Sequence, residues 1–341
     1  MDILALISDK DRLDFSQNLS VTRSYLGDTL FPDVKTENLE AEYFRLSDGL
    51  MLPAMAKVHA FDSEAAIGTR PALEKVTVEK LLIKEKINQS ERIQLYLSRG
   101  VNENAVVEYV FDDMGRLAES VKTRTEVAKM EALSTGAITV KENGLDLKID
   151  YGVPSSNRKK YSWSNPEADI LGNIQEMIEI AKAQGKTVNM AFTSTKVVSA
   201  IRKNKGVQTA MYGANGVGTF ISLGQLNTLM TDMFGFTIVV NDELYKLEKA
   251  DGSFETKRYF TENKFVLATV DSTGALGTGL WGVTPEELDQ GPWTAKSQDQ
   301  YITLTQWKTP DPTTVWTKAS GLFVPVLPDP YGLVIGTIAT A

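Results

Sequence analysis

The chain ends on its most apolar stretch, GLFVPVLPDPYGLVIGTIATA, and this stretch limits what the whole chain can fold into. Pro325, Pro328 and Pro330 interrupt it, and a proline inside a helix costs about 3 kcal/mol because it removes a hydrogen bond and clashes with the preceding turn. Lipid requires every backbone group to be bonded, so a run broken by prolines is a poor membrane span. The pattern instead predicts two strands, residues 322–327 and 331–338, bent at Pro-Asp-Pro and covered by the rest of the fold or by neighbouring copies.

Cysteine and histidine content excludes several classes of chemistry. The 341 residues include no cysteine and one histidine, His59, which excludes disulfides, thiolate nucleophiles, zinc fingers, iron–sulfur clusters and multi-histidine metal sites. A Ser-His-Asp triad could use only His59, which is more simply interpreted as a strand or loop residue. We therefore expect no catalytic residue, no metal and no cofactor.

Length and charge bound the fold and the partners. The length favours about two domains or one large one, and 42% hydrophobic residues suffice for a packed core. The net charge of −8 argues against a general nucleic-acid coat, although an inner surface could touch nucleic acid locally. No positive segment precedes the short apolar run at the N-terminus, so we expect no signal peptide and synthesis in the cytoplasm.

The strongest local pattern predicts a long amphipathic helix at residues 103–134. Its apolar side chains recur every three or four residues, and charged side chains, Glu126 among them, occupy the opposite face. At 1.5 Å per residue this helix spans roughly 45 Å. An alternating stretch at residues 55–85 predicts a long hairpin that turns at residues 66–71, and the turn at residues 142–144 predicts a second hairpin after the helix.

Residues 1–54 predict an arm rather than a domain. A short helix fits the first residues, but Gly, Pro and Asp then interrupt the sequence and no period is sustained. The arm contains apolar segments such as LFPDV, which must be covered by the chain itself or by a neighbouring subunit.

Residues 164–242 have the alternating pattern of an α/β segment. Ser164 or Asn165 can cap a helix that starts at Pro166 and ends at Gly185. A strand, two helices and another strand follow in the sequence. The next stretch, YKLEKADGSFETKRYF, predicts a hairpin that turns at Asp251-Gly252.

Two segments raise the question of ligand binding. Arg158, Lys159 and Lys160 suit contact with a phosphate or an acidic partner, but short charge runs are also common in solvated loops. GANGVGTF, residues 213–220, looks like a phosphate loop, but its glycine spacing departs from the dinucleotide fingerprint and no Walker lysine follows. A flexible loop at a subunit contact is the favoured interpretation of this second segment.

Paired carboxylates and tryptophans do not identify a catalytic site. Asp112-Asp113 lies on the polar face of the predicted long helix, and Glu286-Glu287 suits the start of a short helix, where acids favour the helix dipole. Tryptophans are concentrated late in the chain, where both core packing and an interface would explain them. These late residues are Trp281, Trp293, Trp307 and Trp316.

The order of these elements resembles the major capsid proteins of tailed phages, specifically the lambda-type capsid protein family. The likeness extends over most of the chain and includes no catalytic signature. Four segments carry it: SYLGDTLFP, PEADILGNIQEMIEIAKAQGKTVNMAFTSTKVVSAIRKN, YKLEKADGSFETKRYFTENKFVLATVDSTGALGTGLWGVTPEE and TKASGLFVPVLPDPYGLVIGTIATA.

The resemblance implies an α+β chain with the Hong Kong 97-type capsid fold. The closing strands would then be a buried sheet pair. The implied parts are the N-arm at residues 1–54, the E-loop hairpin at 55–84, the peripheral domain at 85–163 with the spine helix at 103–134, the axial domain at 164–310, and return strands of the peripheral domain at 311–341.

The resemblance also implies a structural protein rather than an enzyme. Copies would assemble as hexamers and pentamers into the icosahedral head shell around phage double-stranded DNA, in the host cytoplasm, and would end in the virion capsid without contact with a membrane. Expected partners are a separate scaffolding protein, because the chain begins almost directly with the arm, a portal protein, a possible decoration protein, and packaged DNA through non-specific contacts. Expected contacts between copies are Ile67, Gly68, Arg70, Pro71, Gly213 and Gly216.

Alternatives from other classes remain open at this point. A cellular nanocompartment shell of the encapsulin type would use the same fold. A nucleotide-binding α/β enzyme would work through Gly213, Gly216 and Gly218. Some relatives crosslink lysine to asparagine, and Lys75 and Lys80 lie near the hairpin, but no motif identifies a crosslinking pair, so we expect no crosslink.

Overall fold

A computed structural model shows the fold. It describes residues 23–46, 73–89, 103–249, 251–289, 295–299, 301–311 and 313–340. The chain divides into two compact units, each drawn from three separate stretches of the sequence. Unit 1 takes residues 1–41, 78–129 and 278–326, and unit 2 takes residues 42–77, 130–277 and 327–341.

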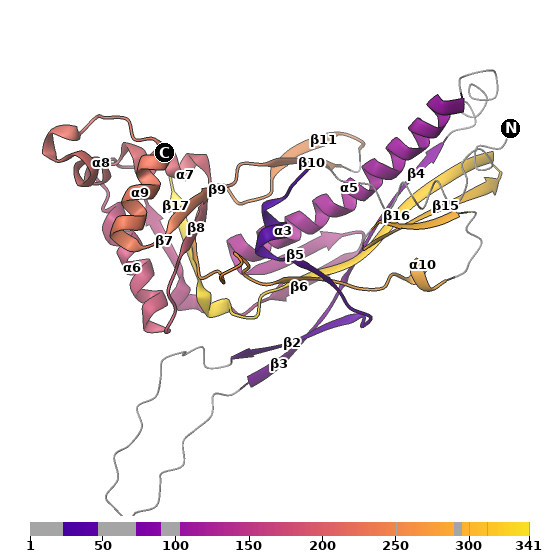
Figure 1. The fold of residues 1–341 in the computed structure, drawn as a ribbon, viewed down its shortest axis with the longest axis horizontal. Coiled ribbons are helices and arrows are strands. Elements are labelled where there is room, and N and C mark those ends of the chain that lie inside the picture. Colours follow the sequence, from indigo (N-terminus) through magenta and orange to yellow (C-terminus); the bar gives the residue numbers. More distant parts are fainter. Residues whose placement is uncertain are drawn as a thin grey trace, which may run out of the picture. The chain divides into compact units, whose positions relative to one another are not determined.

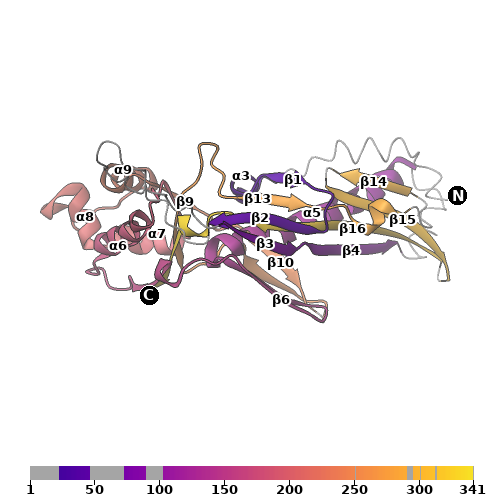
Figure 2. The ribbon, with the colours of Figure 1, turned by 90° about the horizontal axis from the view of Figure 1, so that it is seen from below.

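Unit 1 is built on a six-stranded sheet. Its main path is β1–β13–β16–β15–β14, and β4 pairs along the free edge of β16 (Figure 2). Strand β16 is central because it pairs with β15 and then with β13 along one edge, and with β4 along the other. The bounds are Asp33–Lys35 (β1), Leu81–Gln89 (β4), Thr278–Trp281 (β13), Ala295–Asp299 (β14), Ile302–Pro310 (β15) and Thr313–Val326 (β16).

The long helix α5, Glu103–Thr135, confirms the predicted amphipathic helix (Figure 1). Met114, Leu117 and Val121 of its apolar stripe are buried in unit 1. Gly321 of β16 lets the helix approach the sheet closely, because a Cβ atom there would lie only 3.0 Å from the side chain of Val121. The helix therefore covers one face of the sheet by apolar contact.

Part of the predicted polar face of α5 is buried. Glu126 was expected to face solvent, but it is 1% exposed. Its Oε1 accepts the backbone N–H of Gly27 at 3.1 Å, at the start of the short helix α3, Leu26–Leu30. A side chain at Gly27 would collide with this carboxylate. The charged face of α5 thus binds a part of the predicted arm that forms a short helix.

A buried lysine fixes the same arm segment. The Lys129 side chain of α5 is fully buried, and its Nζ donates to carboxylate oxygens of Asp28 and Asp33, both at 2.9 Å. Burial alone would lower the pKa of Lys129, but the two aspartates outweigh it and raise that pKa. Asp33 then begins β1, which runs parallel to β13 in the sheet.

A two-stranded ribbon joins β2, Glu40–Leu46, to β3, Leu73–Glu79. Strands β3 and β4 occur where the sequence predicted the second half of the long hairpin. The partner of β3 lies in the segment predicted as arm. The first predicted helix, His59 and the predicted turn of the long hairpin lie outside the described residues. The same is true of the contact residues expected at this turn, which are Ile67, Gly68, Arg70 and Pro71.

Unit 2 contains a five-stranded sheet in the order β7–β17–β12–β8–β9, and helices pack on one of its faces (Figure 1). Its core is apolar, formed by side chains such as Ile174, Phe265 and Val334. The parallel pairing of β8 with β9 confirms the predicted α/β segment. The bounds are Arg158–Ser162 (β7), Ile170–Ala183 (α6), Met190–Thr193 (β8), Thr195–Lys203 (α7), Lys205–Tyr212 (α8), Leu223–Phe234 (α9), Thr237–Val240 (β9), Lys264–Ala268 (β12) and Leu333–Ala339 (β17).

Helix α6 starts later than the sequence predicted. Its N-cap is Asp169, whose side chain accepts the N–H of Gly172 at 2.9 Å, so the predicted start at Pro166 is wrong. The carbonyl of Pro166 instead accepts the N–H of Lys205 at 2.8 Å, which holds the preceding residues in a turn. The predicted end is confirmed, because Gly185 has a φ of 75°.

The two closing strands are buried, as predicted, but they do not pair with each other. Strand β16 belongs to the sheet of unit 1, whereas β17 belongs to the sheet of unit 2, between β7 and β12. The expected buried pair is therefore wrong, because residues 327–332 carry the chain from one sheet to the other. Within the described residues, no helix is long and apolar enough to cross a membrane.

Both remaining hairpin predictions are confirmed. Strands β5, Ala137–Glu142, and β6, Leu145–Asp150, join at Asn143 and Gly144, whose φ angles of 51° and 80° fit a tight hairpin turn. Strands β10, Leu244–Glu248, and β11, Phe254–Arg258, pair in the same antiparallel manner.

Candidate assembly surfaces

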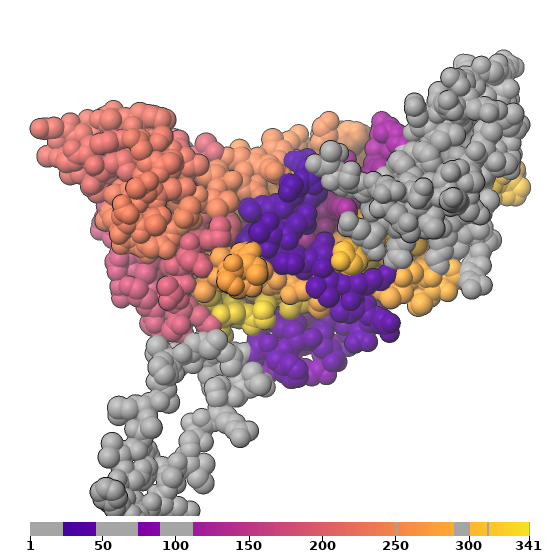
Figure 3. Space-filling view, viewed as in Figure 1, coloured from indigo at the N-terminus to yellow at the C-terminus, as the bar shows by residue number. Residues whose placement is uncertain are grey.

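The loop at residues 213–220 lies between α8 and α9 of unit 2, within the salmon-coloured surface of Figure 3. Gly213 and Gly218 have φ angles of 78° and 94°, which residues with side chains rarely adopt. Gly216 is buried, and a Cβ atom there would lie 2.2 Å from Cβ of Tyr212. The glycines thus shape the loop, and contact of Gly213 and Gly216 with another copy stays a prediction.

One side chain, Gln208, fixes this loop from within. Its Oε1 accepts the N–H of Gly218 at 2.8 Å, and its Nε2 donates to the carbonyls of Arg202 and Thr219 at 3.0 and 3.3 Å. A phosphate loop binds its ligand through free backbone N–H groups. Here the Gly218 N–H is already bonded, and the Ser222 capping box occupies the start of α9. This geometry argues against the nucleotide-binding alternative.

The outside of the same loop is apolar. Tyr212, Val217 and Phe220, which we call the loop patch, are 38%, 47% and 76% exposed. The guanidinium of Arg202 lies 5.8 Å from the centre of the Phe220 ring. A loop that is fixed from within and exposes neighbouring apolar side chains is typical of a protein–protein contact surface.

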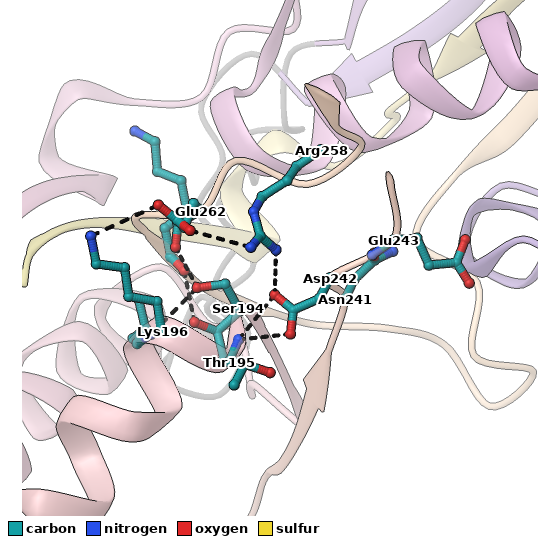
Figure 4. Close-up of polar contacts among 11 residues, drawn as sticks. Ser194, Thr195, Lys196, Asn241, Asp242, Glu243, Arg258 and Glu262 are labelled. Atoms are coloured by element: carbon teal, nitrogen blue, oxygen red, sulfur yellow. Dashed lines mark hydrogen bonds and ion pairs between the residues drawn. The ribbon is translucent and has the colours of Figure 1, made fainter. Parts of the chain in front are cut away.

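A network of charged side chains fixes the base of a second exposed element, the β10–β11 hairpin. Asp242 accepts the N–H of Thr195 at 3.1 Å, at the start of α7, and a guanidinium N–H of Arg258 at 2.8 Å (Figure 4). Arg258 also lies 3.4 Å from Glu262, which pairs with Lys196 at 3.8 Å. These side chains are one third or more exposed, so each pair contributes at most about 1 kcal/mol.

The hairpin itself displays apolar side chains. Leu244 and Phe254 are 47% and 65% exposed. Two-stranded ribbons are marginally stable alone in water, so a ribbon with an apolar surface gains from being covered. The hairpin is therefore a second candidate contact surface of unit 2.

The basic run at residues 158–160 forms a strand, β7, so the solvated-loop interpretation is wrong. The strand forms because this segment pairs in parallel with β17. Lys159 faces α6 and donates to Glu176 at 2.9 Å. Arg158 donates to the carbonyl of Thr135 at 2.6 Å. Two of the three cations thus have partners within the chain, and Lys160 is exposed.

The two lysines considered for crosslinking have local partners. Lys75 pairs with Glu42 at 2.8 Å across the β2–β3 ribbon. Lys80 is 3% exposed, and its Nζ donates to the hydroxyl of Thr36 at 2.6 Å and to the carbonyl of Asn38. Burial lowers the pKa of Lys80. The absence of a crosslink stays a prediction.

The predicted short helix at the carboxylate pair is confirmed as α10, Pro285–Leu288. Its Glu286 is buried and accepts hydrogen bonds from Lys84 at 2.7 Å and Lys318 at 2.9 Å. Burial alone would raise the pKa of Glu286, but these bonds outweigh it and lower the pKa to about 2. This residue does more than complement the helix dipole, because it anchors α10 to the sheet of unit 1.

The other candidates are structural. Asp112 pairs with Arg116 at 2.6 Å on the surface of α5. Trp281 is buried in unit 1, whereas Trp307 and Trp316 stack across β15 and β16 with ring centres 6.2 Å apart. Trp293 lies outside the described residues. Among the described residues, no group of acidic or histidine side chains could hold a metal ion.

Sequence comparison identifies the family. The model of the family described as phage major capsid protein E matches residues 14–338. The chain belongs to the phage major capsid protein E family. This match confirms the resemblance to phage capsid proteins and favours a phage head over a cellular nanocompartment. No curated protein sequence matches this capsid protein.

Solved structures share the fold of this capsid protein. A prophage protein of E. coli CFT073, assigned as a capsid protein, is 16% identical, with a TM-score of 0.60 over 96% of this chain and 98% of its own. A phage-related protein of Bordetella bronchiseptica RB50 is 11% identical, with a TM-score of 0.58 over 95% of this chain and 96% of its own. The predicted α+β capsid fold is confirmed.

The function of the capsid protein follows from its family: it forms the shell of a phage head. Such a role is structural. Sequence analysis missed Phe220 and Phe254, the two most exposed aromatic residues of the candidate surfaces. A usable signal was present for Phe254, because it lies two residues after the Asp251-Gly252 turn of a predicted two-stranded hairpin, which offers little cover for an aromatic ring.

Proposed function

We propose that copies of this capsid protein assemble into hexamers and pentamers, and these into a closed icosahedral shell, through the loop patch and the β10–β11 hairpin. The observation that carries this proposal is the loop patch itself. Gln208 fixes the loop, so Phe220 is displayed without a large loss of conformational entropy on binding. Many such contacts, each weak alone, sum to a stable shell.

The proposed parts follow the family fold. Residues 1–54 act as the N-arm, 55–84 as the E-loop, 85–163 and 278–326 as the peripheral domain, and 164–277 with 327–341 as the axial domain, because β13–β16 share the sheet of unit 1 and β17 pairs within the sheet of unit 2. The apolar core of unit 2 supports a separate axial domain, since residues 164–277 all belong to that unit. The E-loop supplies further contacts at Ile67, Gly68, Arg70 and Pro71.

The proposed partners are a separate scaffolding protein, a portal protein, a decoration protein and packaged double-stranded DNA. Contacts with DNA are non-specific and directed at its backbone. Assembly takes place in the host cytoplasm, and the mature protein resides in the virion capsid. Support for this rests on membership of the capsid family.

Substitution in the loop patch tests the proposal. Phe220→Ser removes the largest exposed apolar side chain, while Asn215→Ser changes an exposed polar residue of the same loop as a matched control. We expect the first variant to fold normally, by circular dichroism, and to lose at least about tenfold in shell yield by sedimentation and negative-stain electron microscopy. Normal shells from Phe220→Ser would show that the loop patch is not an assembly contact.

A further inference from the structure

Three cations of unit 2 gather on one face of the five-stranded sheet. In β17, Thr337 lies opposite Lys264 of β12 and opposite Lys160 of β7. Directly opposed residues project from the same face, so the two lysines flank the threonine. Arg158 projects from this face as well, because it lies two positions before Lys160 on the same strand.

Two of the three cations donate to uncharged partners, and the third, Lys160, is exposed. Lys264 donates to the hydroxyl of Thr337 at 2.8 Å, and Arg158 donates to backbone carbonyls, including that of Thr135 at 2.6 Å. Within the part of the chain that the structure describes, none of these three cations forms an ion pair. Lys159 makes the contrast clear, because it projects from the opposite face of β7 and pairs with Glu176 at 2.9 Å.

The charges of this cluster act on one another. Burial lowers the pKa of Lys264, and the neighbouring charges of Arg158 and Lys160 lower it further. Like charges that repel one another without a neutralising carboxylate form a site where an anion would be stabilised.

We propose that Lys160, Lys264 and the hydroxyl of Thr337, supported by Arg158, form a binding site for a phosphate group. The two ammonium groups can donate to phosphate oxygens from opposite sides. The Thr337 hydroxyl accepts from Lys264 and can donate its own proton to a phosphate oxygen. The chain as a whole is acidic and repels anions. An anion such as phosphate would therefore bind preferentially at this basic cluster.

A phosphate group has two possible sources, a free phosphate and the backbone of duplex DNA. Both have the tetrahedral oxyanion that the cluster recognises. A carboxylate from a second copy of the chain is a different ligand, and its binding would contradict the proposal. Phosphate binding can be measured on the unassembled chain, so the result does not depend on the proposed assembly surfaces.

Binding measurements on the full chain test the site. Calorimetry measures the affinity for inorganic phosphate, and fluorescence anisotropy measures the affinity for a short labelled DNA duplex. Both affinities are compared among the unmodified chain, the double variant Lys160→Gln/Lys264→Gln, and the control Lys159→Gln on the opposite face of β7. The double variant should lose about tenfold or more in affinity for at least one of these probes, while the control changes less than about twofold. Equal losses in both variants, or no binding to the unmodified chain, would overturn the proposal.

A second measurement avoids variants altogether. Competitive acylation with trace acetic anhydride, followed by peptide mass spectrometry, reports the reactivity of each lysine in the unmodified chain. Inorganic phosphate or duplex should slow acylation of Lys264 and Lys160 several-fold and leave Lys159 unchanged. Protection by phosphate alone assigns the free anion, and protection by the duplex assigns the DNA backbone. Equal protection by acetate, or none by any probe, would refute a phosphate site.

Discussion

Both units of the molecule bury apolar side chains, but they differ in how they use buried charge. Unit 1 buries charged groups: Lys129 between Asp28 and Asp33, and Glu286 between Lys84 and Lys318. Unit 2 buries a continuous apolar core, the charged network of Figure 4 lies at its surface, and its buried Lys186 pairs with the partly exposed Asp329. The described elements that unit 1 holds by charge are short ones, α3 and α10.

This difference predicts different responses to conditions. Apolar burial has no titrating group, so it changes little with pH. A buried ion pair repays its desolvation only while both partners stay charged. The carboxylate of Glu286 has a lowered pKa, so we expect acid to loosen the attachment of α10 in unit 1 before it affects the core of unit 2.

The largest expected effect concerns the core of unit 2. Phe265 is fully buried, with its ring centre 5.4 Å from that of Trp163. Phe265→Ala should lower the free energy of unfolding by about 4 kcal/mol, because it removes apolar contact and leaves a cavity. Phe254→Ala is the matched control, since this exposed phenylalanine should cost less than about 0.5 kcal/mol. Urea unfolding at pH 7 and pH 5 measures the loss of stability in both variants. A strong pH dependence of the loss in Phe265→Ala would contradict the expectation that the apolar core of unit 2 responds little to pH.

A smaller loss is expected in unit 1 from Lys129→Met. Methionine keeps the apolar length of the side chain but leaves Asp28 and Asp33 without their buried cation. The expected loss is about 3 kcal/mol. Arg116→Met, which breaks an exposed pair on the same helix, should cost less than about 0.5 kcal/mol. Urea unfolding compares the two, and equal costs would mean that the buried position of Lys129 adds nothing.

Limited proteolysis provides a second measurement for Lys129→Met. Cleavage near α3 should become faster in this variant, because the segment at residues 23–35 loses its anchor. Unchanged cleavage there would show that other contacts hold the segment.

Local features of the fold were predictable from the sequence. The stripe of α6 and the turns at Asn143-Gly144 and Asp251-Gly252 depend on neighbours within a few residues. The sheet membership of β16 and β17 was not predictable, because it depends on pairing with strands far away in the sequence. A local pattern indicates that a strand is buried, but it does not indicate which sheet buries it.

The charged contacts of the phosphate site and of unit 1 were likewise not predictable from the sequence. The sequence pattern places Glu126 and Lys129 on a helix face that would be exposed to solvent. Their partners lie about one hundred positions earlier in the chain. The basic run at residues 158–160 is evident in the sequence. Only the register of β7 with β17 shows that one of its cations faces α6 and that the other two project from the opposite face. Lys264, the third member of the cluster, carried no sequence signal.

Glu286 gives the smallest of the three stability effects and the sharpest test of the pH difference. Its folded-state pKa of about 2 lies below its ordinary value of 4.5. The carboxylate therefore stabilises the fold fully above about pH 4.5, and this contribution disappears as the pH falls from there towards 2. Glu286→Gln should cost about 2 kcal/mol at pH 7, because two charge-assisted hydrogen bonds weaken, and should cost progressively less in acid.

The comparison of Glu286→Gln with Glu262→Gln separates burial from charge. Both substitutions remove a carboxylate that contacts two cations, but Glu262 lies at the surface of unit 2. Thermal melts from pH 7 to pH 3 should converge for Glu286→Gln and the unmodified chain, while Glu262→Gln stays close to the unmodified chain throughout. If the two variants behaved alike, the acid response would belong to the total charge of the chain and not to the buried anchor of α10. If only Glu286→Gln removes the acid-induced loss, unit 1 carries a pH-dependent attachment that the apolar core of unit 2 lacks.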